Sequence, residues 1–385
     1  MPTEAQEPAN KILVAKILES EWPLCIVAGD HQSVAARLVR VGVAVLALPI
    51  VLVLIGWKEG NLLLPRPAIG LMQDWNILAM FVAFPAAVLL LVLAARRLDE
   101  FLNRLVGLID QDGDCNRAVT VAEIKATYTD IVNGMGFWRA LRWIGIIAGL
   151  SFVAFNALNR YFRFSAIYAS GFWTSSQYPL SFWATCLYTL MVWGYLAPII
   201  AFKLISLLVI ISRIVGRIGR TLKFKPTVLS PDRAGGLKAL GSVALALSYV
   251  VLPFQLNCLV YYYWIPKVNP PFVIGVSIVL TFTVVLFSIP VWFTHRAMTR
   301  ARDAVLEKVS DLYNRRLKEV LSDSCEVAPQ GFERVLGEMK ALEEVFDTML
   351  RIRVWPVDLG VIGRFSAVVA VPLVVAFLQQ LLKLK

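Results

Sequence analysis

Long apolar runs, separated by polar segments rich in charge, dominate the pattern along this chain. A membrane-spanning helix needs about 20 mostly apolar residues, because every backbone polar group in the bilayer core must be bonded within the helix. Six runs meet this requirement, the third at the short end, and a seventh is marginal because Gln379 and Gln380 interrupt it. The six are residues 36–57, 76–95, 143–158, 182–202, 239–264 and 272–293, and the seventh is residues 365–382. The pattern predicts an all-α fold, a polytopic transmembrane helical bundle.

These runs divide the chain into membrane and cytoplasmic parts. We expect a cytoplasmic N-terminal segment (1–35), transmembrane helices 1 and 2 (36–95), a cytoplasmic helical loop (96–142), transmembrane helices 3 to 6 (143–294), a cytoplasmic helical hairpin (295–355) and a C-terminal segment that spans or re-enters the membrane (356–385). The first residues lack a basic patch that leads into a short apolar core and a cleavage site, so no removable signal peptide is expected.

Composition and charge agree with a membrane protein and fix its expected orientation. Hydrophobic residues make up 58% of the chain and charged residues 17%, which departs from the composition of soluble domains. With the N-terminus inside, 31 of the 38 Lys and Arg residues fall in cytoplasmic segments, as the positive-inside rule requires. The net charge of +11 therefore indicates topology, and no nucleic-acid partner is expected. We predict a multi-pass protein of a bacterial inner membrane with a cytoplasmic N-terminus.

The segment 295–355 carries two amphipathic helical patterns joined by a short polar break. Apolar residues recur at helical spacing, and in the second pattern they follow the 3-4 steps of a coiled-coil seam. They are Leu306, Val309, Tyr313, Leu317 and Val320, then Phe332, Val335, Met339, Leu342, Phe346 and Met349. The two stripes either pack on each other or join a second copy in a homo-oligomer, and the short connection favours self-packing.

An acidic cluster in the loop 96–142 resembles an EF-hand loop, in which oxygen ligands occupy fixed positions along 12 residues. The candidate Ca²⁺ ligands are Asp110, Asp112, Asp114, Asn116 and Glu123. Counting from Asp112 puts Glu123 at the last position, but Arg117 then stands where the loop needs glycine. Caps and Asx turns are the alternative role of these residues. Ca²⁺ is the one cofactor that the sequence suggests.

A basic loop before the fifth run is the candidate site for an anion or a lipid headgroup. Basic clusters at the inner surface favour anionic lipid headgroups, and glycine lets the backbone approach a ligand closely. The candidate residues are Asp232, Arg233, Gly235 and Gly236. The alternative is a simple helix start, with Ser230 as the cap and Pro231 at the first position.

Three short motifs carry a family resemblance. They are PDRAGGL at residues 231–237, Asp74-Trp75 at the start of the second run, and residues 355–358 before Pro372. Together they resemble an uncharacterised family of bacterial multi-pass inner-membrane proteins with a PDxAGGL motif. This chain has Ser230 where the family usually has His, and Val357 where it usually has Phe. The resemblance implies a shared fold and location and brings no activity.

The predicted spans contain few polar or ionisable residues that could carry catalysis or transport. The chain has two histidines and no recognisable nucleophile motif or metal set, so no catalytic residue is predicted and an enzyme is not expected. Lys203 is expected to extend its side chain to the inner boundary of the fourth run. Gln255 and Asn257, two residues apart after Pro253, are the candidate contacts of a transport pathway. Hydrogen bonds to neighbouring helices are the alternative role, and for each residue taken alone that role is favoured.

The sequence alone leaves three possible functions open. Kink-forming prolines, intramembrane amides and a long cytoplasmic hairpin favour a channel or transporter-like bundle that is regulated through its cytoplasmic helices. The alternative is a membrane-anchored signalling or scaffold protein that binds partners or anionic lipids. A lipid-modifying enzyme that uses the PDRAGGL surface is the weaker alternative.

Overall fold

The computed structural model describes residues 34–65, 68–109, 177–221, 239–264, 270–322, 329–351, 355 and 357–383, with 126, 143, 145–147 and 150–151. Within them the chain is helical and contains no strand. The elements are α2 (Val34–Lys58), η4 (Leu71–Gln73), α3 (Trp75–Ile109), α6 (Pro179–Thr189), η6 (Leu190–Leu196), α7 (Ala197–Thr221), α8 (Ala239–Tyr249), α9 (Leu252–Trp264), α10 (Pro270–Ser322), α11 (Pro329–Leu350) and α12 (Leu359–Lys383). The predicted all-α class is confirmed.

Four described stretches are long and apolar enough to cross a membrane, which fits the expected membrane protein. They are Ile77–Asn103, Pro179–Gly216, Ala239–Leu259 and Val276–Lys318, and they overlap the second, fourth, fifth and sixth predicted runs. The first and seventh runs fall on α2 and α12, whose described apolar stretches, Leu46–Lys58 and Leu359–Val374, are shorter. Most of the third run, residues 143–158, lies outside the described residues.

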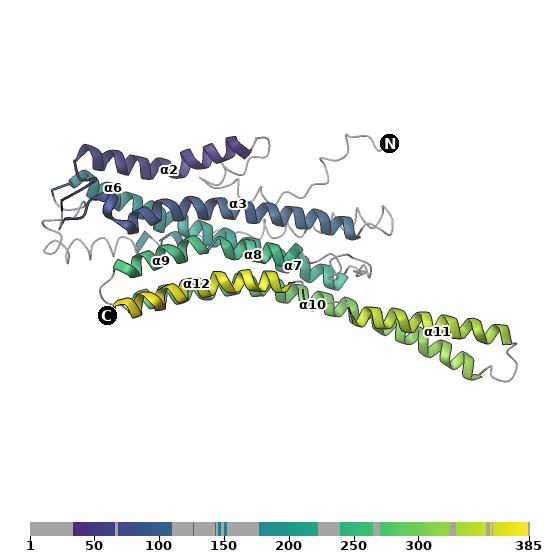
Figure 1. Cartoon of the computed structure of the whole chain (residues 1–385). Coiled ribbons are helices and arrows are strands. Elements are labelled where there is room, and N and C mark those ends of the chain that lie inside the picture. Colours follow the sequence, from purple (N-terminus) through teal and green to yellow (C-terminus); the bar gives the residue numbers. More distant parts are fainter. Residues whose placement is uncertain are drawn as a thin grey trace.

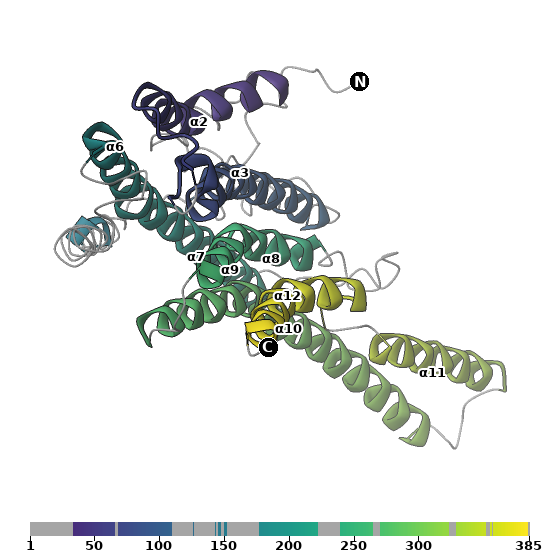
Figure 2. The same cartoon turned by 60° about the vertical axis from the view of Figure 1, so that its left-hand side comes forward.

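The long helices lie side by side in one bundle (Figure 1). Helix α3 and the continuous α6–η6–α7 rod both begin at the left end in Figure 1, and α8 and α9 return in the opposite direction. Helix α3 packs on α8 and α9, while α10 packs on α7 and α8. Helix α10 starts at that same left end, continues past the bundle and carries α11 beside its far part (Figure 2).

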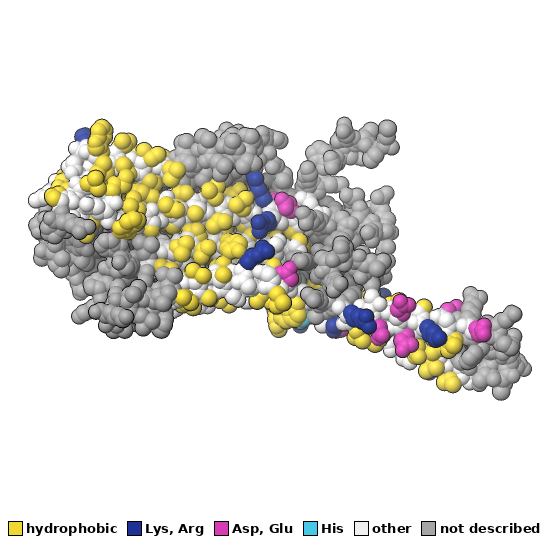
Figure 3. Space-filling view, in the orientation of Figure 1, with side chains coloured by type: hydrophobic (Ala, Val, Ile, Leu, Met, Phe, Trp, Pro, Cys, Tyr) yellow, Lys and Arg dark blue, Asp and Glu magenta, His cyan; other side chains and the backbone are white. Residues whose placement is uncertain are grey.

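One apolar core joins α3, α7 and α8 along the length of the bundle. Its fully buried members on α3 include Phe84, Leu91, Leu98 and Leu102, which recur at the spacing of one helix face. The outer surface of the bundle is also apolar. The side chains of Trp183 on α6 and Ile278 on α10 are largely exposed there. Figure 3 shows hydrophobic side chains over the visible bundle face, with charged residues in a band at its right-hand end and along the projecting α10 and α11. An apolar surface of this extent fits contact with lipid.

The turn after α2 holds the N-terminus of α6. The Glu59 carboxylate accepts hydrogen bonds from the backbone N–H groups of Leu180 and Ser181, at 2.9 and 2.8 Å. Asn61 donates a side-chain hydrogen bond to the Ser181 hydroxyl at 2.9 Å. Gly60 allows this turn because its φ is +72°, a conformation that other residues seldom adopt. A carboxylate at a helix N-terminus satisfies donors that have no partner within the helix.

Helix α11 lies antiparallel to the far part of α10, and the two are joined at the tip (Figure 1). Val309 on α10 and Met349 on α11 are buried, and Tyr313 and Met339 are partly buried. Arg316 and Glu338 form a salt bridge across the pair at 3.3 Å. Of the predicted seam, Val309, Tyr313, Met339 and Met349 are thus buried or partly buried where α10 and α11 pack, whereas Leu317 is 37% exposed.

Aromatic stacking attaches α12 and the segment before it to α10. The rings of Phe287 on α10 and Phe365 on α12 stack with centroids 3.9 Å apart. The His295 and Trp355 rings stack in the same way at 4.1 Å. Helix α12 also packs on α8 and α9, so the C-terminal helix belongs to the bundle.

Candidate functional site

The helix that runs through α8 and α9 is interrupted at Val250 and Val251. Here the Val250 N–H bonds to the Leu247 carbonyl and the Val251 N–H to the Ser248 carbonyl, so the last turn of α8 tightens to a three-residue spacing. Pro253 cannot supply the N–H that the Tyr249 carbonyl would receive in a regular helix. The sequence signal was Pro253 itself, and the structure places the break just before it.

Gln255 lies in the first turns after this break and faces α10. Its side chain is 3% exposed, and Nε2 donates a hydrogen bond to Oγ1 of the buried Thr283 at 2.7 Å. The Thr283 hydroxyl in turn donates to the Val279 carbonyl at 2.9 Å. Oε1 of Gln255 is buried and accepts no hydrogen bond. A buried polar atom left in this state costs free energy comparable to a lost hydrogen bond, so the site favours an additional partner.

Asn257 faces a different part of the interior. Residues two apart on an α-helix point in nearly opposite directions, so α9 separates Gln255 from Asn257 rather than joining them in one site. Asn257 is 5% exposed, and its Nδ2 group has no hydrogen-bond partner. It follows Phe254 by three residues and therefore lies on the same face of α9.

Aromatic rings line that face. Phe84 of α3 makes edge-to-face contacts with Phe254 at 5.1 Å and with Trp193 of η6 at 5.7 Å. One turn nearer the start of α3, Phe81 meets Tyr188 of α6 in the same geometry at 5.4 Å. The Asn257 amide thus lies on a helix face that is otherwise aromatic and apolar.

The rod that carries Trp193 changes its helical pitch at this level. Residues Leu190–Leu196 form a π-helix, in which the Ala197 N–H bonds to the Val192 carbonyl five residues before it. Gly194 lies within it, and a Cβ there would meet Cδ2 of Leu150 at 2.5 Å and its Cα at 3.4 Å. The π-turn therefore coincides with a close approach of a neighbouring segment. Such turns are rare and often occur at functional sites.

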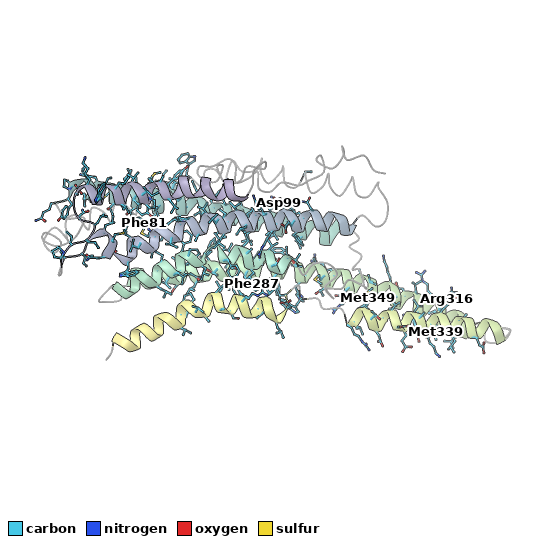
Figure 4. The ribbon with its side chains drawn as sticks, turned by 45° about the horizontal axis from the view of Figure 1, so that its top comes forward. Phe81, Asp99, Phe287, Arg316, Met339 and Met349 are labelled. Carbon is cyan, nitrogen blue, oxygen red and sulfur yellow. The ribbon has the colours of Figure 1, made fainter. Side chains whose placement is uncertain are left out.

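Two buried charged side chains add to the polar content of the bundle. Asp99 on α3 is 8% exposed and Lys203 on α7 is 3% exposed. Figure 4 shows Asp99 in the second half of α3, far along the helix from Phe81. The expectation that Lys203 extends to the boundary is wrong, because its side chain is enclosed by the bundle. Charged groups inside an apolar bundle are expensive and commonly functional.

Asp99 was missed because residues 96–142 were assigned to a cytoplasmic loop. A signal was present in the sequence, since Leu91, Ala95, Leu98 and Leu102 continue the apolar face of α3 through this region. Asp99 follows Ala95 by four residues and so borders that face.

Other predicted site residues lie outside the described residues. These are the candidate Ca²⁺ ligands Asp110, Asp112, Asp114, Asn116 and Glu123, and the candidate headgroup site at Asp232, Arg233, Gly235 and Gly236. Both sites stay predictions. Among the residues that are described, no group of three or more His, Cys, Asp or Glu side chains could hold a metal ion.

The arrangement offers neutral hydrogen-bonding groups and aromatic faces inside an apolar bundle, next to two irregular helix segments. Each of the two unpaired amide atoms, Gln255 Oε1 and Asn257 Nδ2, would gain a hydrogen-bond partner from a polar species that reached it. Comparison with protein-family models, with curated proteins and with solved structures gives no match. The resemblance to the PDxAGGL family therefore stays a prediction.

Proposed function

We propose that the protein is a channel or transporter-like bundle of a bacterial inner membrane that is regulated through its cytoplasmic helices. The observation that carries this proposal is the pair of buried side-chain atoms on α9, Gln255 Oε1 and Asn257 Nδ2, which lack hydrogen-bond partners. A protein that only needs to pack gains nothing from them, since apolar residues of similar size would avoid the cost.

The irregular helices support the same function. Discontinuous helices inside membrane transporters often carry the binding site, because unwound backbone becomes available to the transported species. The break at Val250 and Val251 and the π-helix Leu190–Leu196 both adjoin the candidate residues.

Regulation through the hairpin is supported by the continuity of α10. This one helix runs from Pro270 to Ser322, so it includes Thr283 inside the bundle and Arg316 in the hairpin. A displacement of the hairpin would be transmitted along this continuous helix, past Pro290, to the partner of Gln255. The proposed orientation, with six spans, a marginal seventh and the N-terminus in the cytoplasm, puts the hairpin on the cytoplasmic side together with most basic residues.

Two further elements belong to this proposal. Ca²⁺ at Asp112 and Glu123 would act close to α3, which ends at Ile109. Anionic lipid headgroups at Arg233 would act close to the start of α8 at Ala239. Both are positioned in the sequence next to helices that pack on each other, so each ligand would bias the same bundle.

A flux assay in reconstituted vesicles tests the proposed function. Purified protein is inserted into vesicles, and the movement of ions and small neutral solutes is followed with and without Ca²⁺ and under a membrane potential. We expect a flux above that of empty vesicles, which Gln255→Leu and Asn257→Leu reduce at least about tenfold if each removes a pathway contact. Thr294→Val is the control, because Thr294 is buried on α10 but bonds only to its own helix, at the Pro290 carbonyl. Vesicles that exclude every solute under all conditions would contradict the proposal.

A scaffold function is the second candidate, and the projection of the hairpin favours it. The end of α10 and all of α11 extend past the bundle (Figure 1), with Leu312 and Leu336 exposed among charged residues. Site-specific photo-crosslinkers at these two positions, in the full chain in cell membranes, would form an adduct with one defined protein. Crosslinks to lipid and water alone would exclude this candidate.

A further inference from the structure

We propose that an anionic phospholipid binds at the point where α10 leaves the apolar bundle. Its phosphate contacts Arg296 and Arg300, and its glycerol region contacts two exposed indoles, Trp292 of α10 and Trp355 of the segment before α12. In α10, no Lys, Arg, Asp or Glu precedes Arg296. Figure 3 shows the corresponding change of surface, since hydrophobic side chains cover the visible bundle face and charged ones line the projecting part of α10. The site thus lies at the end of an apolar stretch, where a lipid headgroup would meet the chain.

Three aromatic rings form a row at this point, and they come from two segments of the chain. The His295 ring stacks on the Trp355 ring with centroids 4.1 Å apart and planes at 12° to each other. The Trp292 ring lies 6.3 Å from the same imidazole. Trp292 is 59% exposed and Trp355 is 49% exposed. An indole has an apolar body and an N–H donor, so two exposed indoles beside one imidazole suit the boundary between acyl chains and headgroups.

Two arginines on α10 supply the positive charge of the site. Trp292, Arg296 and Arg300 follow one another in four-residue steps, so they lie on one side of the helix. Both arginines are exposed, and neither forms an ion pair within the part of the chain that the structure describes. The next acidic residue along α10, Asp303, is bonded to Arg302 instead, at 3.0 Å. Like charges four residues apart repel each other on a helix, so a phosphate that contacts both arginines would relieve the repulsion.

The chemistry of these groups selects the class of ligand. Arginine binds phosphate through two parallel N–H···O bonds, and exposed indoles favour the glycerol region of a bilayer. The carboxylate of Asp358, three residues after Trp355 in the sequence, caps α12 by accepting the Val361 N–H at 2.8 Å. Two arginines without an ion pair favour a lipid of net negative charge over a zwitterionic one, whose ammonium group they would repel. A soluble phosphate has no apolar part that could contact the indoles.

Topology alone is the competing explanation for these arginines. Basic residues next to a span fix its orientation without binding any particular lipid. In that case an exposed arginine at the end of another apolar run would attract anionic lipid about as well as Arg296 does. A defined site depends instead on Arg296 and Trp355 in particular.

Native mass spectrometry of the purified full chain in detergent decides between the two explanations. Delipidated protein is titrated with dioleoyl phosphatidylglycerol, and in parallel with the phosphatidylcholine that carries the same acyl chains. We expect a saturable first step of about one phosphatidylglycerol per chain, with a Kd at least about tenfold lower than that for phosphatidylcholine, because only the anionic lipid gains from both arginines. Inorganic phosphate added to the titration should leave the lipid bound, because it cannot replace the contacts of the apolar part.

Matched variants identify the contacts. Arg296→Gln should raise the Kd for phosphatidylglycerol at least about tenfold, which corresponds to the loss of one charge-assisted contact. Arg97→Gln, at an exposed arginine that follows the apolar run of α3, should retain the wild-type Kd. Trp355→Leu should raise the Kd about threefold or more through the lost indole contact, whereas Trp57→Leu, at a 72% exposed position in α2, should not. Arg296→Gln leaves every ring contact in place, so it tests the site even if Trp355→Leu disturbs the docking of α12.

Equal Kd values for the two lipids, or equal Kd values for Arg296→Gln and wild type, would overturn the lipid site. Displacement of the lipid by inorganic phosphate would overturn it as well, because a plain anion site would then explain the arginines. The site requires that α10 crosses a membrane, as proposed above, but it does not require transport. A protein that binds the lipid at Arg296 and carries no flux would refute transport alone, and a protein that transports without this preference would refute the lipid site alone.

Discussion

At the residue scale, single glycines and carboxylates determine how the helices are joined. Gly70 packs its Cα against the chain before it, where a Cβ would lie 2.5 Å from the Leu62 carbonyl oxygen. Glu59 bridges α2 and α6 over 121 residues of sequence. Neither role could be predicted from the sequence, because a glycine or glutamate in a loop carries no sign of which distant segment it meets. The sequence did indicate Gln255 and Asn257 as buried amides, since polar residues are rare in such apolar runs.

Replacing Gly70 by alanine should destabilise the protein by about 1–3 kcal/mol, because the added methyl group meets rigid backbone. The matched control is Gly337→Ala in α11, where a Cβ meets nothing within 4 Å. That change should be stabilising by about 0.5–1 kcal/mol through the higher helix propensity of alanine. Thermal unfolding in detergent compares the two variants. A lower Tm for Gly337→Ala than for Gly70→Ala would show that the loop before α3 is not packed as described.

Replacing Glu59 by alanine should lower the stability by about 1 kcal/mol, the usual effect of losing a helix cap. The loss arises because two backbone N–H groups at the start of α6 give up their acceptor. Lys58→Ala, at the exposed neighbouring residue, serves as the control in the same melting experiment. Equal Tm values for the two variants would contradict the capping role.

At the scale of elements, the sequence predicted the presence and position of the helices better than the residues at which they end. Apolar runs predicted where α3, α8 and α10 lie, since every spanning helix must be apolar over about 20 residues. They did not predict that α3 continues to Ile109, because charged residues such as Arg96 and Arg97 suggested a boundary. The π-helix η6 was not predicted either, since no pattern in its own residues marks it; it coincides with the close approach of Leu150 to Gly194.

The hairpin allows a direct test of its pairing. Cysteines at positions 316 and 338, where the structure has a salt bridge, should be joined by a short bifunctional thiol reagent within one chain. The five native cysteines are first replaced by serine. Self-packing predicts cross-linked monomers at all protein concentrations. A second cysteine pair, at the exposed positions Leu312 and Leu350, is tested with the same reagent for comparison. Cross-linked dimers as the main product would instead support a stalk made by two copies.

At the scale of the whole molecule, the protein is an apolar helical bundle with a charged hairpin at one end and polar atoms in its interior. Hydrophobicity and charge distribution suffice to predict the apolar bundle and the charged hairpin. An apolar surface suits contact with lipid, and a charged surface suits contact with water. The interior could be predicted only in part. Which polar residues meet, as Gln255 and Thr283 do, depends on helix contacts that a single sequence does not encode locally.

Transport along α9 requires that the interior around this helix admits water and polar solutes at some stage of function. The most direct measurement is the reaction of Asn257→Cys, in an otherwise cysteine-free chain in native membranes, with a small water-soluble thiol reagent. Only a thiol in contact with water forms the reactive thiolate readily, so we expect position 257 to react while Leu245→Cys, a buried apolar control on α8, does not. Equal protection of both positions would mean a dry, fully packed bundle and would contradict a transport pathway along α9.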